Sequence, residues 1–108
     1  MAADRVILDC GSKTLTTDVA RGFGPTPGYG VVVTPEVSSV DETLVIERLS
    51  EEHATVRAVG HTAFEPGDRV RVLPNHACVV ANMVNDVLLV DGELVIDRLH
   101  VAARGKTT

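Results

Sequence analysis

Apolar residues follow one another along this chain in short runs that are rich in valine, isoleucine and leucine. Runs of this kind, bounded by glycine, proline and acidic residues, predict β-strands, and almost no stretch shows the periodicity of an amphipathic helix. Residues 69–73, Arg-Val-Arg-Val-Leu, alternate most regularly, which predicts a strand with one buried and one solvated face. The strands that we expect cover residues 5–10, 13–17, 29–34, 43–49, 55–59, 69–73, 78–83, 87–90 and 94–101.

Turn residues separate these runs at two clear points. Pro-Gly-Asp at 66–68 precedes the strand 69–73, and Asp-Gly at 91–92 separates two apolar runs, which is a strong local signal for a β-hairpin. Eight or nine short strands at this spacing predict an all-β fold, and we expect a single compact β-barrel-like domain of about eight strands, with a β-sandwich as the alternative. Residues 21–30 hold four glycines and two prolines, which is typical of a connection or of a backbone that approaches a ligand closely.

Length and charge narrow the possible functions. The 108 residues fit one domain, and the formal net charge is −5 with the basic residues scattered along the chain. A nucleic-acid surface needs clustered Lys and Arg, and base stacking needs aromatic residues, of which this chain has one tyrosine and two phenylalanines. We therefore expect no nucleic-acid partner.

The apolar residues and the cysteines also bear on location. No apolar run is long enough to span a bilayer, and residues 1–5 lack the long apolar region of a signal peptide. We therefore expect a cytoplasmic protein with no membrane partner and with reduced thiols. Cys10 and Cys78 lie far apart and form no CxxC pair, which excludes a redox motif or a zinc ribbon of that spacing.

Residues 74–78, Pro-Asn-His-Ala-Cys, place an imidazole and a thiol two positions apart. In an extended strand, side chains at i and i+2 point to the same face, so His76 and Cys78 could both reach one metal ion, and Zn²⁺ accepts this pair of ligands. Two ligands are too few for a closed structural site, so a metal here would keep open positions, as catalytic metals do. The alternative is a buried cysteine beside a histidine that is satisfied by hydrogen bonds.

Three other segments carry candidate chemistry. Tyr29, between two glycines, could serve as an acid or base beside a ligand, or could simply pack on the end of the barrel. Residues 9–13, Asp-Cys-Gly-Ser-Lys, lack the spacing of a phosphate-binding loop and are expected to form a strand end and a turn. Residues 51–53, Glu-Glu-His, are expected to form a solvated turn, with a further ligand or a proton relay as the alternative.

Residues 64–78, with the pattern PGDxVxxxPNHxC, resemble the C-terminal domain of the D-serine dehydratase-like family. That family also contains D-threonine aldolases and related pyridoxal-phosphate enzymes of the alanine-racemase fold type. The resemblance covers the whole chain in order. Its other matching positions are 9–13, 28–30, 50–53, Asn82, Asp86, 91–92 and 101–105.

The resemblance implies a two-domain enzyme in which a TIM-type barrel carries pyridoxal phosphate on a lysine and the β-domain covers the cofactor. In that family the His and Cys of PNHxC hold a divalent metal, usually zinc, so His76 and Cys78 are the implied ligands here. D-Threonine aldolases tend to carry Asp where this chain has Cys78, which favours a dehydratase and a thiophilic metal. Asn75 is expected to orient the imidazole of His76, because it is the adjacent residue and ligating imidazoles need their other nitrogen fixed.

The barrel of that family is missing from this chain, so no cofactor-binding residue is expected in it. Residues 1–108 would be the C-terminal β-domain, and the chain would be an excised domain, a split subunit or a remnant. Met1 and residues 105–108 resemble the natural limits of that module. The isolated chain is expected to be inactive, with a barrel domain or subunit, a D-amino-acid substrate and a second copy of itself as partners. An apolar face is expected where the barrel would dock.

In the complete enzyme, the resemblance implies a D-serine dehydratase or a D-threonine aldolase type of lyase. Pyridoxal phosphate would stabilise a carbanion, and zinc would activate the β-hydroxyl of the substrate. The alternative function is a non-catalytic metal-binding or partner-docking β-barrel module. A plain β-barrel in which the PNHAC sequence arose by accident is a third interpretation.

Overall fold

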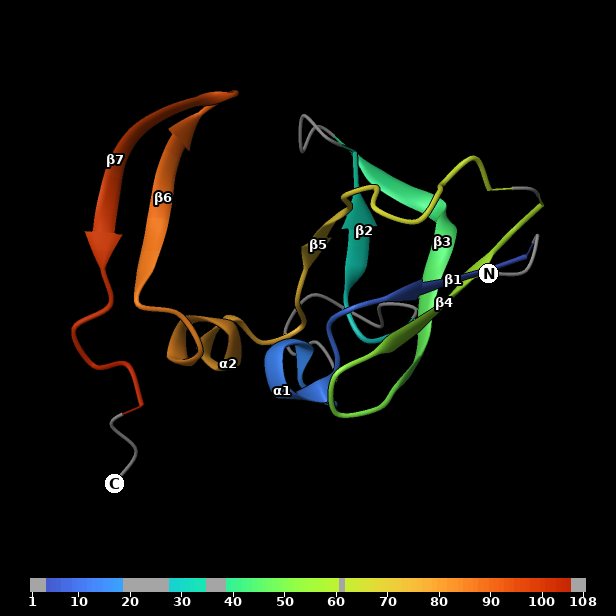
Figure 1. The fold of residues 1–108 in the computed structure, drawn as a ribbon, viewed down its shortest axis with the longest axis horizontal. Helices are drawn as coiled ribbons and strands as arrows, with labels where there is room; N and C mark the ends of the chain where they lie inside the picture. The colour runs from blue at the N-terminus through green and yellow to red at the C-terminus, as the bar shows by residue number, and fades with distance from the viewer. Residues whose placement is uncertain (1–3, 19–27, 35–38, 61, 106–108) are drawn as a thin grey trace.

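The structure is a computed structural model, and it describes residues 4–18, 28–34, 39–60 and 62–105 (Figure 1). Within these ranges the chain forms seven strands and two short helices, which confirms the expected all-β class. In chain order the elements are β1 (Arg5–Leu8), α1 (Ser12–Leu15), β2 (Val31–Val33), β3 (Val40–Leu49), β4 (Ala54–Ala58), β5 (Arg71–Leu73), α2 (Ala77–Asn82), β6 (Asp86–Asp91) and β7 (Leu94–His100).

Five strands form one antiparallel sheet in the order β1-β4-β3-β2-β5, and this sheet curls into a half-barrel (Figure 1). Burial alternates along β4, where Ala54, Val56 and Ala58 are buried and Arg57 is exposed, because successive side chains of a strand point to opposite faces. The inward side chains pack into one apolar core. Its buried members are Val6, Leu15, Val32, Leu44, Ile46, Ala54, Val56 and Ala58.

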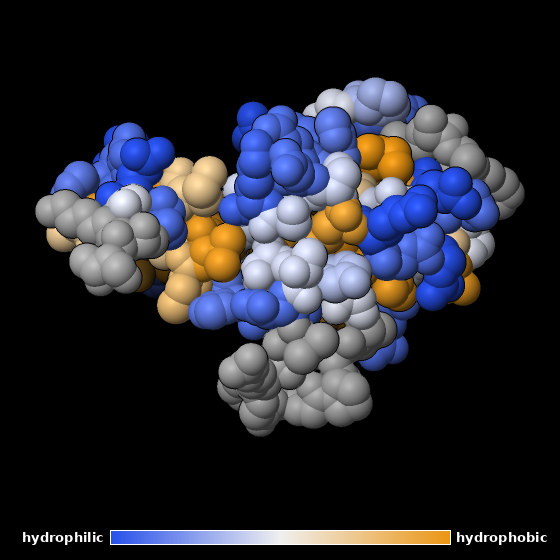
Figure 2. All heavy atoms as spheres, turned by 90° about the horizontal axis from the view of Figure 1, so that it is seen from below, coloured by the Kyte–Doolittle hydropathy of each residue, from blue (hydrophilic) through white to orange (hydrophobic). Residues whose placement is uncertain are grey.

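The strands β6 and β7 form a separate two-stranded sheet beside the half-barrel, to which α2 connects it (Figure 1). The Asp91-Gly92 turn joins them, as the sequence predicts, and all residues of both strands are exposed. The Val101 N–H donates to the Asn85 carbonyl at 2.7 Å, which joins the two ends of the hairpin, and the Gly105 N–H donates to Asn82 Oδ1 at 2.7 Å, which ties the following turn to α2. Figure 2 shows apolar side chains reaching the surface on this side of the molecule.

Two segments expected as strands are helices, and this part of the prediction is wrong. Residues 12–15 turn into α1 because Gly11 lies against the β3–β4 turn: a Cβ at Gly11 would stand 2.3 Å from the Ser50 carbonyl oxygen. That close approach lets the Ser12 N–H donate to the same oxygen at 2.8 Å. Residues 77–82 form α2, since short apolar runs do not distinguish strand from helix and the two alanines of this run favour helix.

Other differences are smaller. The strand expected over 69–73 is limited to β5, and the described residues contain seven strands where about eight were predicted. Of the glycine-rich loop 21–30, residues 21–27 lie outside the described part of the chain. Gly28 has φ +84° and stands so close to β3 that a Cβ would lie 2.3 Å from the Ile46 carbonyl oxygen. Among the described residues, neither helix is long and apolar enough to cross a membrane.

Candidate metal site

The helix α2 begins directly after His76, and this changes the geometry expected for residues 74–78. His76 is the N-cap with extended backbone angles (φ −144°, ψ 105°), and Cys78 lies in the first helical turn. Each helical residue rotates the side chain by about 100° around the axis, so the same-face argument for a strand does not apply. Cys78 is exposed and its thiol is free, so the interpretation of Cys78 as a buried structural cysteine is wrong.

The imidazole of His76 is held by a carboxylate from a distant segment. Nδ1 of His76 lies 2.9 Å from Oδ2 of Asp18, and both side chains are about half exposed (47% and 51%). A neutral imidazole that faces a carboxylate through Nδ1 carries its proton there, so Nε2 keeps a lone pair. Metal-ligating histidines in proteins generally make this contact through the nitrogen that does not bind the metal.

Asn75 does not orient the ring of His76 through a bond that the structure shows. Its Nδ2 donates to the backbone carbonyls of Asp18 and Gly28, at 3.1 Å each. The side chain therefore joins the N-terminal end of α2 to two other segments, one of which supplies the carboxylate that contacts His76. The predicted effect of Asn75 on metal binding stays a prediction.

The donor atoms fit zinc in kind but do not form a closed site. His76 offers an imidazole nitrogen and Cys78 a thiol sulfur, both of which zinc accepts. Across the described ranges, no group of three or more His, Cys, Asp or Glu side chains is placed to hold a metal ion. A metal at this position would thus take at most two ligands from the described residues and keep positions for water or substrate.

Tyr29 is partly buried and packs against the core cluster. Its backbone N–H donates to the Ile46 carbonyl at 3.0 Å, which fixes this segment to β3. This environment agrees with the packing interpretation of Tyr29, and a role as acid or base stays a prediction.

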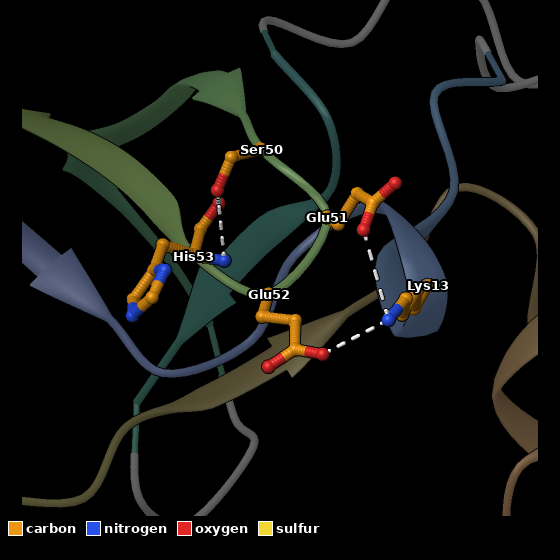
Figure 3. Close-up of polar contacts among 5 residues, drawn as sticks. All are labelled: Lys13, Ser50, Glu51, Glu52 and His53. Atoms are coloured by element: carbon orange, nitrogen blue, oxygen red, sulfur yellow. Dashed lines mark hydrogen bonds and ion pairs between the residues drawn. The ribbon is translucent and has the colours of Figure 1, made fainter.

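A second polar cluster brings together the two motifs at 9–13 and 50–53 (Figure 3). The amine of Lys13 lies 2.9 Å from Glu52 Oε1 and 3.7 Å from Glu51 Oε2, while the ring of His53 points away from it. The hydrogen bond and charge of Glu52, helped by Glu51, raise the pKa of Lys13, and Lys13 in turn lowers the pKa of Glu52. Lys13 is therefore a charged surface residue, unsuited to form a Schiff base.

The described residues 51–53 are all exposed, which confirms the expected solvated turn. Of the strand end and turn expected at 9–13, the strand end is found, since β1 ends at Leu8 and Asp9 forms a bend, but Ser12 and Lys13 lie in α1 rather than in a turn. Asp18 is the residue at the candidate site that sequence reasoning missed. It lies 58 positions before His76, and no local pattern relates the two.

The curled antiparallel sheet and its separate hairpin together have an alanine racemase-like fold. The fold is similar to part of an alanine racemase-like protein of Idiomarina loihiensis, with a TM-score of 0.60 and 26% identity over 91% of this chain. This chain spans 27% of the length of that protein.

Residues 1–90 match the family described as "Putative serine dehydratase domain", and the chain belongs to this family. Relatives in Mycobacterium tuberculosis and Mycobacterium bovis, both described as uncharacterised proteins, are 42% identical over 106 residues, which is 94% of this chain and 71% of theirs. The resemblance to the D-serine dehydratase-like family is thereby confirmed.

Proposed function

We propose that this chain is the metal-binding β-domain of a pyridoxal-phosphate-dependent D-amino-acid lyase of the D-serine dehydratase or D-threonine aldolase type. The observation that carries the proposal is the contact of His76 with Asp18, which leaves Nε2 of the imidazole available beside a helix that presents the exposed thiol of Cys78. Membership of the serine dehydratase domain family supports it.

The described residues do not fit pyridoxal phosphate itself. Lys13 is the described lysine, and two glutamates hold its amine in the charged form. The cofactor would therefore lie on a TIM-type barrel domain or subunit, which this chain would complete.

Zinc would supply Lewis-acid polarisation of the β-hydroxyl of a D-amino acid. The residues of this chain would prepare that site. His76 would offer its Nε2 lone pair while Asp18 would keep the proton on Nδ1, and Cys78 would bind as a thiolate after losing its proton to solvent. The exposed positions of His76 and Cys78 leave room for substrate and water.

Metal analysis of the chelator-washed chain after incubation with zinc tests this proposal. We expect one zinc per wild-type chain, and we expect His76→Ala and Cys78→Ala each to lose stoichiometric zinc, because neither remaining ligand suffices alone. His100→Ala is a matched control, since His100 also contacts an aspartate through Nδ1. Wild-type zinc content in the His76 and Cys78 variants would contradict the site.

A second experiment tests the lyase. Mixed with a barrel polypeptide that carries the cofactor lysine, the wild-type chain should yield pyruvate from D-serine, and the His76→Ala chain should not. The second candidate function is a non-catalytic docking or metal-binding module, and the exposed apolar hairpin favours it. Zinc binding without any activity in the mixed sample would support that module.

A further inference from the structure

We infer that Asp18 is a positioning residue, which holds the imidazole of His76 in the tautomer and direction that present Nε2 to the metal. The inference rests on the proposed zinc site and adds to it a residue outside the His-x-Cys motif. Its basis is the 2.9 Å contact between His76 Nδ1 and Asp18 Oδ2, which joins two segments 58 residues apart.

Two further contacts fix the position of Asp18. The side-chain amide of Asn75 donates to the backbone carbonyl of Asp18 at 3.1 Å, so consecutive residues at the start of α2 both contact Asp18. On the other side, the backbone N–H of Asp18 donates to Oγ1 of Thr16 at 3.3 Å. Asp18 is thus held through its backbone on two sides, while its carboxylate contacts the ring.

The segment that leads to Asp18 is itself constrained. Thr16, at the C-terminal end of α1, is buried and adopts φ 60°, a backbone conformation that is rare for a β-branched residue. Such conformations are strained and persist only where surrounding contacts impose them. The Thr16 N–H donates to the Ser12 carbonyl at 3.1 Å, so α1 determines where the chain leaves towards Asp18.

The contact also distinguishes two roles for the carboxylate. A positioning carboxylate accepts the Nδ1 proton and leaves the metal on Nε2, whereas a carboxylate that shares the metal with His76 would place the metal on Nδ1. The N–O distance of 2.9 Å is that of a charge-assisted hydrogen bond. The structure therefore favours the first role.

The test uses the full chain, labelled with ¹⁵N in its imidazoles. In the absence of metal, at a pH where the ring is neutral, NMR should show the His76 proton on Nδ1. Asp18→Ala should reduce the population of this tautomer, and Asp18→Asn, which keeps the size but removes the charge, should have an intermediate effect. In the zinc-loaded wild type, the metal should be on Nε2.

Zinc affinity is the second measurement, by competition with a chromophoric chelator. Loss of the partner of a ligating histidine weakens metal binding about 10- to 100-fold, and we expect this range for Asp18→Ala, with partial rescue by Asp18→Glu. Asp86→Asn is the matched control: Asp86 contacts His100 Nδ1 at 3.3 Å on the hairpin, so its loss should alter the His100 signals and leave zinc affinity unchanged.

The outcomes separate this inference from the proposed function. Wild-type zinc affinity in Asp18→Ala and Asp18→Asn, or zinc found on Nδ1, would overturn the inference while the zinc site stands. A wild-type chain that binds no zinc would refute the proposed site, whereas the metal-free tautomer would still report on the Asp18–His76 contact. If Asp18→Ala fails to fold, as judged by amide chemical shifts, Asp18→Asn and Asp18→Glu carry the test.

Discussion

The two cysteine thiols lie in different environments. Burial raises the pKa of Cys10, and the charge of Asp9 raises it further, while Cys78 is exposed at the start of α2. Because the thiolate is the reactive form, iodoacetamide at neutral pH should modify Cys78 at least several-fold faster than Cys10. Mass spectrometry of timed samples measures both rates.

Zinc should slow the modification of Cys78 and leave that of Cys10 unchanged if Cys78 is a ligand. Calcium, which prefers oxygen ligands, serves as the control ion. If iodoacetamide modified Cys10 faster than Cys78, or if zinc slowed only the modification of Cys10, the assignment of Cys78 as the exposed zinc ligand would be contradicted.

The ion pair of Lys13 with Glu52 predicts a small dependence of stability on pH. The pKa of Glu52 is lowered in the folded chain, so its contribution is present above the unfolded value, near 4.5, and is lost as the pH falls through the folded value. The pKa of Lys13 is raised, so its contribution is present below 10.5 and is lost as the pH rises through the folded value.

Urea unfolding should therefore show that Lys13→Gln lowers the midpoint slightly at pH 7, and that the difference from the wild type becomes smaller as the pH falls below 4.5. The effect should shrink in high salt, because both side chains are exposed. Arg57→Gln, which removes the exposed ion pair of Arg57 with Glu47, should likewise have an effect that shrinks in high salt. A difference that stays the same at all pH values would indicate a role of Lys13 other than this ion pair.

At the level of single residues, the sequence identified His76, Cys78 and Asn75 as candidates but not Asp18. A sequence motif identifies residues that are close along the chain. Asp18 and His76 are far apart in the sequence and come together only in the folded structure. The spacing of His76 and Cys78 places both side chains on one face only if the segment is a strand. In the structure α2 begins directly after His76, so that condition is not met.

Among the elements, turn chemistry was more informative than the apolar runs. The Asp91-Gly92 hairpin and the turn at 66–68 were predicted correctly, because glycine and proline restrict the backbone locally. The helices α1 and α2 were not predicted, because a four-residue and a six-residue helix are too short to show a helical period. The contact of Gly11 with the β3–β4 turn depends on tertiary structure alone.

The strand β3 and the hairpin should respond differently to loss of an apolar side chain. Ile46 in β3 is fully buried, and Ile46→Ala should lower the free energy of unfolding by about 2–5 kcal/mol through lost burial and the cavity that remains. Leu94 in β7 is 67% exposed, and Leu94→Ala should cost about 0.5 kcal/mol or less. Urea denaturation followed by circular dichroism measures both, and similar losses would contradict this assignment of the core.

Among the described residues, the half-barrel contains the core and the hairpin contains most of the exposed large apolar side chains. Isolated two-stranded hairpins are marginally stable in water, so β6 and β7 would gain stability from a covering partner. A docking barrel and a homodimer remain predictions for this surface. Its exposed apolar residues are Val87, Leu88, Leu89, Val90, Leu94, Val95, Ile96 and Leu99.

Light scattering coupled to size exclusion tests self-association of the isolated chain. The wild-type apparent mass should rise with concentration, and the double variant Val87→Ser and Leu99→Ser, at directly opposite positions of the hairpin, should remain monomeric. Val40→Ser, at an exposed position of the five-stranded sheet, is the control and should behave like the wild type. A wild-type chain that stays monomeric throughout would exclude self-association through this face.

The contact between Asp18 and His76 relates the folding of the chain to the state of the imidazole. All of β2, β3, β4 and β5 lie between these two residues in the sequence, so the contact of the imidazole with the carboxylate closes a loop that contains four of the five strands of the half-barrel. The position of the proton on the His76 ring, measured by NMR, would therefore indicate whether the chain is folded. A zinc ion that binds the assembled form and not the unfolded chain would shift the folding equilibrium itself, which couples metal supply to the lifetime of the protein.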